Sequence, residues 1–347
     1  MEGNDMVDAS APTLAARVQR HTVAQFVDGP LREAIAGLEP SLRHMAGYHF
    51  GLIDQDSTPA RPRDDVLRRR SATFTLLGAG SEPCNWQRAL HTAVANQLQG
   101  AALFIHDDLV DEDRLRYGRP TIWAAFGVGA AVHLGDALQN LALQVLDRNR
   151  PPRRDQLRTA MLTCCARIFA GQTTEMVMEQ QRHGNLETAL AVYRDKTANS
   201  VSYMFSSGAS SAGADTARVD AAAQFGFRLG MAAQFHNDLE SLYRDGDTQL
   251  KDTLSDLRQR KMTAIVAYAL GRDDPRTKEL TDLYRADTMI DGEQARRIRR
   301  LLEETGATQW ARDQEREYLT AARALIPKVS DGPNSTGELH KVLELHH

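Results

Sequence analysis

The sequence from residue 88 to residue 127 reads RALHTAVANQLQGAALFIHDDLVDEDRLRYGRPTIWAAFG. Its apolar side chains recur at intervals of three and four residues as far as Leu109, a spacing typical of a long amphipathic helix over residues 88–112. No comparable run alternates apolar and polar residues as a half-buried strand does. The sequence therefore predicts an all-α fold, with further long helices over residues 128–147, 154–182, 215–245 and 295–324.

Composition argues against several classes of protein. The chain has 347 residues, 42% of them apolar, and 42 Lys and Arg stand against 46 Asp and Glu, a formal net charge of -4. This balance argues against nucleic acid as a partner and favours a small molecule. No run approaches the roughly 18 apolar residues of a membrane span. Three cysteines without metal-ligand spacing, and no signal-peptide pattern, predict a cytoplasmic protein.

The chain is expected to form one large helical domain over residues 21–347, preceded by a flexible N-terminal tail over residues 1–20. The segment from Asp54 to Arg70 is charged and contains proline. Such a composition predicts an exposed loop that runs into the next helix.

Three acidic residues end the first predicted helix. Asp107 and Asp111 are four residues apart, so their carboxylates lie on one helical face, and Asp108 lies beside them. Like charges repel, and the C-terminal end of a helix disfavours anions, so a cation is expected to compensate. Because Mg²⁺ prefers carboxylate and phosphate oxygens, this face is a candidate site for a metal-bound diphosphate. The alternative is a solvated acidic turn.

A second polar stripe lies in NDLESLYRD, residues 237–245. Asn237, Ser241 and Asp245 follow at intervals of four residues, which places their oxygen atoms on one helical face. An amide, a hydroxyl and a carboxylate together can hold Mg²⁺ and leave positions for phosphate and water. Taken alone, the stripe is more simply an exposed polar face. Together the two motifs predict a metal-lined mouth over a central apolar cavity in a helical bundle.

Basic side chains near the motifs can neutralise a diphosphate. Each taken alone is more simply a surface residue, so only the position beside the motifs supports a role. The candidates are Arg116, Arg119, Lys196, Lys251 and Lys261.

Apolar and aromatic side chains near the motifs are candidates for the cavity wall. Ala102 and Leu103 lie one turn before Asp107 and are not bulky, so a long C15 or C20 chain is expected to extend past them. Aromatic faces can stabilise a carbocation, although each aromatic residue is more often part of an ordinary core. The aromatic candidates are Phe104, Tyr203, Phe205 and Phe235.

The order of these motifs resembles the trans-isoprenyl diphosphate synthase (polyprenyl synthetase) family. The resemblance runs from about Tyr48 to Leu270. It implies an isoprenoid synthase fold, usually a homodimer, with Mg²⁺, expected as three ions, held by the two acidic motifs. It also implies an allylic diphosphate substrate, with Gln172 among its contacts and Gln234 in the pocket. Besides the opening stretch, it rests on GDAL at 135–138, GQTTE at 171–175, KT at 196–197, QFHNDLES at 234–241 and SDLRQRKMT at 255–263.

Several positions depart from the family pattern. Where the family has GKxxRP, this chain reads RDDVLRRR, with Asp65 in place of the lysine and Arg69 in place of the proline. Gly100 stands where the family has His or Gln, and Tyr117 replaces the second of two arginines. In the family these positions mostly serve isopentenyl diphosphate, and an Asp in place of Lys turns attraction into repulsion. The resemblance therefore predicts a lost acceptor subsite.

NDLESLYRD is also similar to the (N/D)Dxx(S/T)xxxE motif of class I terpene cyclases, with Asp245 in place of the Glu. Those enzymes ionise one allylic diphosphate and need no second one. We therefore expect a Mg²⁺-dependent terpene synthase that converts farnesyl or geranylgeranyl diphosphate into a hydrocarbon or alcohol. One alternative is a polyprenyl diphosphate synthase or prenyltransferase that uses isopentenyl diphosphate or an unusual acceptor. Another is a non-catalytic subunit, which would be expected to lose the metal carboxylates that this chain keeps.

Overall fold

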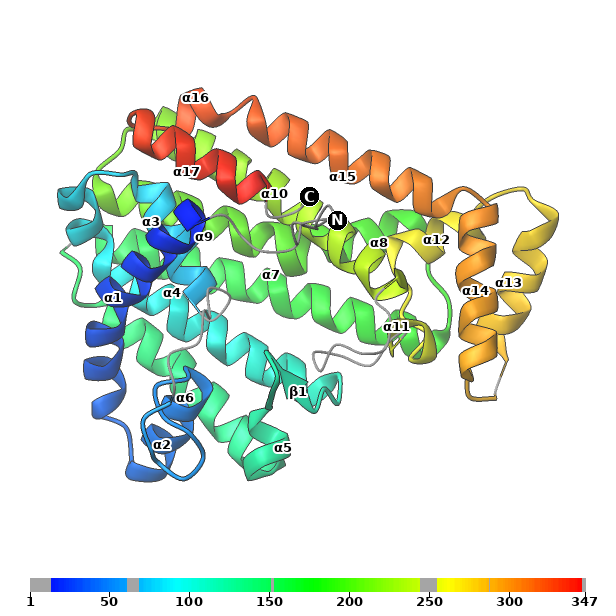
Figure 1. The fold of residues 1–347 in the computed structure, drawn as a ribbon, viewed down its shortest axis with the longest axis horizontal. Coiled ribbons are helices and arrows are strands. Elements are labelled where there is room, and N and C mark those ends of the chain that lie inside the picture. The colour runs from blue at the N-terminus through cyan, green and yellow to red at the C-terminus, as the bar shows by residue number, and fades with distance from the viewer. Residues whose placement is uncertain (1–13, 61–68, 151–152, 244–254, 287, 345–347) are drawn as a thin grey trace, which may run out of the picture.

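The computed structural model of the chain describes residues 14–60, 69–150, 153–243, 255–286 and 288–344. Helices make up almost all the regular structure of these residues, which confirms the all-α prediction (Figure 1). A small antiparallel hairpin, β1 (Leu115–Arg116) and β2 (Arg119–Pro120), follows the first acidic motif. Tyr117 and Gly118 both have positive φ, 53° and 70°, as a tight two-residue hairpin turn requires.

Long helices form the centre of the molecule (Figure 1). Four of them, α4, α6, α7 and α10, agree with predicted segments to within a few residues, apart from the start of α4, whereas α3 and α9 were not predicted. The helix α9 packs against α3, α4, α7 and α10, and α6 packs against α4. The bounds are α3 (Arg70–Ala79), α4 (Pro83–Val110), α6 (Val128–Leu146), α7 (Arg153–Gln181), α9 (Asn199–Ala212) and α10 (Thr216–Tyr243).

The other helices surround this centre. At the N-terminal side, α1 begins at Leu14, inside the tail that was predicted over residues 1–20; residues 1–13 lie outside the described part. Towards the C-terminus, α15 lies along α10 (Figure 1). The bounds are α1 (Leu14–Ala36), α2 (Pro40–His49), α5 (Ile122–Phe126), α8 (Leu186–Val192), a π-helical turn η2 (Tyr193–Ala198), α11 (Ser255–Arg258), α12 (Ala264–Leu270), α13 (Pro275–Arg285), α14 (Gly292–Glu304), α15 (Ala307–Arg323), α16 (Ile326–Val329) and α17 (Pro333–Glu344).

The prediction of one helix over residues 295–324 is wrong, because α14 and α15 are separate helices. Gly306 lies between them with φ +76°, a left-handed conformation that glycine adopts without steric cost and that ends a helix. The start of α14 is fixed independently, since Asp291 and Gln294 form a reciprocal capping box. Both signals are visible in the sequence, but the continuous apolar spacing outweighed them.

Apolar side chains are buried in three neighbouring clusters among the described residues. Phe205 and Phe235, which were candidates for the cavity wall, have no exposed surface. Phe205 packs edge-on against Phe225, with ring centroids 5.0 Å apart, and Phe235 packs against Trp310 in the same way at 5.6 Å. Both phenylalanines therefore serve the core that holds the central helices together.

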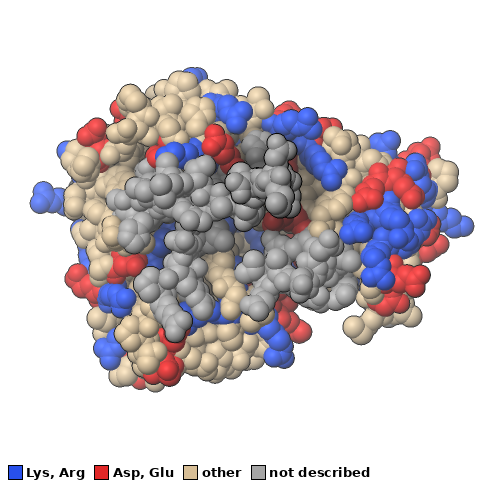
Figure 2. All heavy atoms as spheres, in the orientation of Figure 1, with Lys and Arg blue, Asp and Glu red and all other residues tan. Residues whose placement is uncertain are grey.

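Charges of both signs lie intermingled on the face shown in Figure 2. Lys and Arg gather most densely near α13 and α14, where acidic side chains lie among them. Within the described ranges, no helix combines the length and the apolar character needed to cross a membrane. The cytoplasmic location stays a prediction.

Candidate active site

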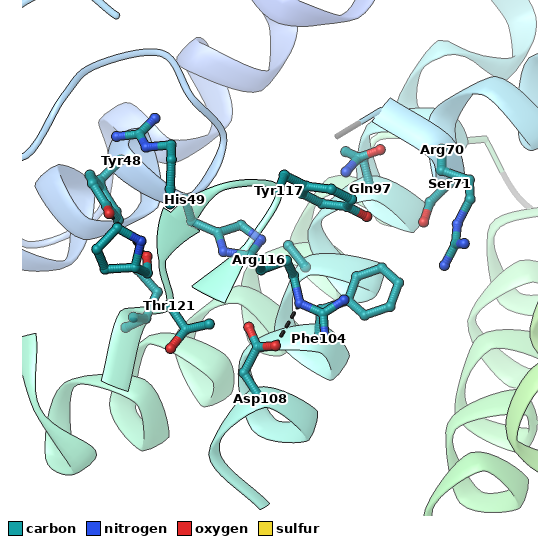
Figure 3. Close-up of a pocket in the computed structure, with 14 residues that line it drawn as sticks. Tyr48, His49, Arg70, Ser71, Gln97, Phe104, Asp108, Arg116, Tyr117 and Thr121 are labelled. Atoms are coloured by element: carbon teal, nitrogen blue, oxygen red, sulfur yellow. Dashed lines mark hydrogen bonds and ion pairs between the residues drawn. The ribbon is translucent and has the colours of Figure 1, made fainter. Parts of the chain in front are cut away.

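The end of α4 carries the first acidic motif. Asp107 and Asp108 lie in its last turn, and Asp111 is the residue after the helix, with its amide donating to the carbonyl of Asp107 at 2.8 Å. The β1–β2 hairpin then turns the chain back over this end. As a result, Nε of Arg116 lies 2.5 Å from Oδ1 of Asp108 (Figure 3).

The Arg116–Asp108 pair is largely shielded from water, since the Asp108 side chain is 3% exposed and that of Arg116 18%. Phe104 covers the guanidinium, whose carbon lies 4.7 Å from the ring centroid. Burial raises the pKa of Asp108 to about 7, and the charge of Arg116 opposes that rise. An aspartate buried in this way depends on its cation, which explains why Arg116 follows so closely in the chain.

Two lysines contact the other carboxylates of the motif. Nζ of Lys196 lies 3.2 Å from Oδ1 of Asp107 and 2.7 Å from Oε2 of Glu175 on α7. Nζ of Lys261 lies 2.9 Å from Oδ2 of Asp111. The cationic compensation that the sequence demanded is therefore supplied by side chains from three separate segments.

These contacts set the charge states of the site. Burial raises the pKa of Asp107, but the charges of Lys196, Arg116 and Lys261 outweigh it, so the pKa lies below its ordinary value. Burial raises the pKa of Asp111, which Lys261 only partly offsets. Burial lowers the pKa of both lysines, but the negative charges of the neighbouring carboxylates outweigh it and raise the pKa above the ordinary value. Both lysines therefore stay charged and available for an anionic ligand.

The second motif is arranged differently from the prediction. Asn237 is exposed, and Ser241 donates its hydroxyl to the carbonyl of Asp238 at 2.8 Å. Asp245 and Lys251 lie outside the described residues. The buried polar residue of the motif, among those described, is Asp238, which accepts hydrogen bonds from the Tyr193 hydroxyl and from Nε2 of Gln234.

No group of three or more His, Cys, Asp and Glu side chains converges as a ready metal site in the described part of the chain. Lysine ammonium groups contact the carboxylates instead. The donors still suit Mg²⁺ in kind, since Asp107, Asp111 and Glu175 offer the hard oxygens that this ion prefers. Assignment of metal to Asp107, Asp108, Asp111, Asn237, Ser241 and Asp245 stays a prediction.

A small cavity of about 40 Å³ lies beside Asp108, and neither Lys196 nor Lys261 is among the residues that line it (Figure 3). Three arginines line it, and the guanidinium of Arg70 lies 5.1 Å from the Phe104 ring centroid, so that this ring has Arg70 and Arg116 as neighbours. The third, Arg119, lies 4.1 Å from the ring centroid of Tyr48. His49 and Gln97 also line the cavity.

The positions that depart from the family pattern border this cavity or lie outside the described residues. Tyr117 lines it, whereas Asp65 is not described. A side chain at Gly100 would place its Cβ 2.4 Å from Oγ of Ser71, another lining residue. The place of a histidine or glutamine at 100 is therefore filled by Ser71, and the cavity keeps a cationic wall without it.

The remaining predicted residues lie around α4, α7 and α9. Gln172 is half-buried on α7, one turn before Glu175, and Tyr203 is half-buried on α9 against the α4 cluster. Ala102 is buried and Leu103 half-buried. Sequence reasoning missed Glu175, Glu179, Arg70, His49, Tyr193 and Asp238. The spacing of four between Glu175 and Glu179, which repeats that of Asp107 and Asp111, was an available signal.

Comparison with known proteins shows the family. The polyprenyl synthetase family model matches residues 68–303. A geranylgeranyl diphosphate synthase of Mycobacterium tuberculosis is 30% identical over 314 residues, which are 88% of this chain and 87% of that protein. The chain belongs to the polyprenyl synthetase family.

Solved structures share the fold over nearly the whole chain. The crystal structure of a polyprenyl synthetase from Streptomyces coelicolor A3(2) has a TM-score of 0.81 and 28% identity, and covers 94% of this chain and 98% of its own. A geranylgeranyl pyrophosphate synthase from Corynebacterium glutamicum, solved with isoprenyl diphosphate and magnesium, has a TM-score of 0.76 at 22% identity, with 94% of this chain and 96% of its own covered. The predicted isoprenoid synthase fold is confirmed.

The expectation of a terpene cyclase, a lyase, is wrong. The curated relatives carry the names of geranylgeranyl and farnesyl diphosphate synthases, which are prenyltransferases. That expectation rested on NDLES and on a lost acceptor subsite. The structure accounts for the error in part, because arginines from other positions line the cavity beside Asp108, and Asn237 is exposed.

Glu179 should make stability depend on pH. Burial raises its pKa to about 7 from an ordinary 4.5, against the charge of Lys261. The native state therefore holds a proton that the unfolded chain has lost between these pH values, and stability falls as pH rises through this window. We expect the free energy of unfolding of Glu179→Gln, measured with urea, to exceed that of wild type by about 1–2 kcal/mol above pH 7. The difference should be much smaller below pH 4.5. An equal difference at both pH values would contradict the assignment.

Proposed function

We propose that the protein is a prenyltransferase that joins an allylic prenyl diphosphate to isopentenyl diphosphate. The products are a longer prenyl diphosphate, inorganic diphosphate and a proton. The observation that carries this proposal is the pair of cationic groups that flank the acidic end of α4. Lys196 and Lys261 contact Asp107 and Asp111, whereas Arg70 and Arg119 line the cavity beside Asp108. Two anionic substrates can therefore lie side by side.

The lysine side is assigned to the allylic diphosphate. Lys196 and Lys261 are held by carboxylates and can turn to phosphate oxygens without changing their protonation state. Mg²⁺ is assigned to the carboxylate oxygens of Asp107 and Asp111, with those of Glu175 facing them. On the second motif, the proposed ligands are Asn237, Ser241 and Asp245. Magnesium, when bound, neutralises the negative charge of the departing diphosphate. Gln172 and Lys251 are further proposed contacts of the diphosphate.

The arginine side is assigned to the acceptor diphosphate. Guanidinium groups bind phosphate through paired hydrogen bonds, and Arg70, Arg116 and Arg119 all line this cavity. Arg116 already pairs with Asp108, which leaves Arg70 as the main free candidate at the cavity wall. Arg119 is steadied by Asp54, 3.2 Å from its NH2 group.

The proposed reaction needs no protein nucleophile. The carbon–oxygen bond of the allylic diphosphate breaks, and the double bond of the acceptor donates its electron pair to the allylic carbon. A proton then leaves the acceptor. The protein is proposed to hold the two diphosphates side by side at the acidic end of α4, so that their hydrocarbon parts meet. Ala102 and Leu103 are proposed to border the growing chain.

The activity is tested by incubation of the purified protein with Mg²⁺, farnesyl diphosphate and isopentenyl diphosphate, followed by mass spectrometry of intact diphosphates. We expect a longer prenyl diphosphate that forms only when isopentenyl diphosphate is present. Asp107→Asn should lower kcat by about a hundredfold or more, because it removes a carboxylate assigned to the Mg²⁺ that neutralises the departing diphosphate. Asp313→Asn, in an exposed ion pair on α15, is the matched control. Turnover by Asp107→Asn at the wild-type rate would contradict the site.

The acceptor assignment predicts a selective effect at Arg70. Arg70→Gln should raise KM for isopentenyl diphosphate by about tenfold, the loss of one charged hydrogen bond, and leave KM for the allylic substrate unchanged. Arg316→Gln, which removes an exposed guanidinium on α15, serves as the control. An equal rise in both KM values would place the acceptor elsewhere.

We also propose that the protein forms a homodimer through α7. Leu162, Phe169 and Met176 are spaced seven residues apart on this helix and are 52%, 43% and 36% exposed. That spacing places them on one face, and such a stripe of large apolar side chains is typical of a protein interface. On the neighbouring α6, Val128 and Val132 are exposed as well. A second copy of this chain is the proposed partner.

Phe169→Glu should break this interface, because it places a charge in the middle of the apolar stripe. Sedimentation equilibrium is expected to give the mass of two chains for wild type and of one chain for the variant. The exposed Met289→Glu, on the loop before α14, is the control and should stay dimeric. A wild-type monomer, or an unaffected variant, would contradict the interface.

A further inference from the structure

The π-helical turn η2 carries Lys196 through a narrow gap between α7 and α10. A Cβ atom on Gly171 of α7 would lie 3.0 Å from the backbone nitrogen of Lys196. A Cβ atom on Gly230 of α10 would lie 2.6 Å from Cα of Ala198. The backbone of the turn therefore touches both helices. Turns of this kind are rare, and they are often found at functional sites.

Tyr193, the first residue of this turn, has a hydroxyl with two buried partners. It donates a hydrogen bond to the carboxylate of Asp238 on α10. It accepts one from the backbone N–H of Ala264, at 3.1 Å, where α12 begins. Tyr193 is 3% exposed and Asp238 6% exposed, so water cannot easily replace either bond.

This hydroxyl links the two segments that carry the lysines. Lys196 follows Tyr193 by three residues, and Lys261 precedes Ala264 by three residues. Both lysines reach the first acidic motif, Lys196 at Asp107 and Lys261 at Asp111. One tyrosine–aspartate pair therefore lies behind both of the cations assigned to the allylic diphosphate.

A second chain of hydrogen bonds ties the same turn to the same carboxylate. The hydroxyl of Thr197 donates to Oε1 of Gln234 at 2.7 Å. The amide nitrogen of that glutamine donates to Oδ1 of Asp238 at 3.0 Å. Asp238 thus accepts one hydrogen bond from Tyr193 and one from Gln234, and the latter is bonded to Thr197. Both chains of hydrogen bonds fix the turn η2 to α10.

We propose that Tyr193 and Asp238 are positioning residues, which act through Lys196 and Lys261 to set these ammonium groups for a diphosphate. The inference rests on the proposed function for the identity of the ligand. In this proposal Asp238, the buried aspartate of the second acidic motif, does not contact metal directly. It holds protein segments in place by its hydrogen bonds to Tyr193 and Gln234.

The test replaces the hydroxyl alone. Tyr193→Phe keeps the ring that packs edge-on against Phe235, with centroids 5.1 Å apart, and removes both hydrogen bonds. We expect it to weaken binding of inorganic diphosphate, measured by calorimetry with Mg²⁺, by about tenfold or more. KM for the allylic substrate should rise in parallel, with KM for isopentenyl diphosphate unchanged. An affinity for diphosphate equal to that of wild type would overturn the proposal.

Tyr284→Phe is the matched control. Tyr284 is 1% exposed in the same apolar cluster as Tyr193, and its hydroxyl has no hydrogen-bond partner among the described residues. Its removal should leave diphosphate binding unchanged. If Tyr284→Phe lost as much diphosphate affinity as Tyr193→Phe, the effect would come from general destabilisation by loss of a buried hydroxyl. That result would overturn the positioning role of Tyr193.

Asp238→Asn separates an anchor from a metal ligand. The amide keeps an oxygen that can accept the bond from Tyr193, and its nitrogen can donate to Gln234 once that side-chain amide turns over. Diphosphate affinity should therefore stay within about threefold of wild type. A loss of diphosphate affinity of about tenfold or more would assign Asp238 to the metal and overturn the anchor role. Because inorganic diphosphate binding requires no prenyl transfer, a protein without elongation activity would refute the proposed function and leave this test intact.

Discussion

The structure of the site depends on one electrostatic constraint, the repulsion among carboxylates at the end of α4. Three acidic side chains within five residues, at the helix end that disfavours anions, require cations close by. Arg116, Lys196 and Lys261 supply them at 2.5–3.2 Å from segments far apart in the chain. The charges proposed to bind the substrate diphosphate are therefore the charges that hold the site together before substrate arrives.

That constraint explains several local features of the fold. The hairpin β1–β2 exists where Arg116 must turn back onto Asp108, and its turn has the positive φ angles that a two-residue connection needs. The π-helical turn η2 brings Lys196 to Asp107 between two glycines, and Tyr193 ties it to the start of α12. Each feature departs from regular helix at a point where a cation reaches the acidic motif.

The sequence predicted four of the long helices, α4, α6, α7 and α10, together with the first acidic motif and the three cations that contact it, because these follow from apolar spacing and from local charge balance. It could not predict Arg70 and Arg119 lining one cavity, since both come together only when α3 and the hairpin meet beside α4. The acceptor subsite was therefore judged lost from single positions such as Tyr117. Asp238 was passed over for its neighbour Asn237 because helical spacing cannot say which face is buried.

In the proposed site, the ammonium groups of Lys196 and Lys261 compete with Mg²⁺ for Asp107 and Asp111 until a diphosphate binds them. Calorimetric titration of Mg²⁺ into the wild-type protein, with and without inorganic diphosphate, tests this competition. We expect weak binding of Mg²⁺ alone and much tighter binding in the presence of diphosphate, because the anion draws both lysines away from the carboxylates. Equally tight binding of Mg²⁺ without diphosphate would contradict it.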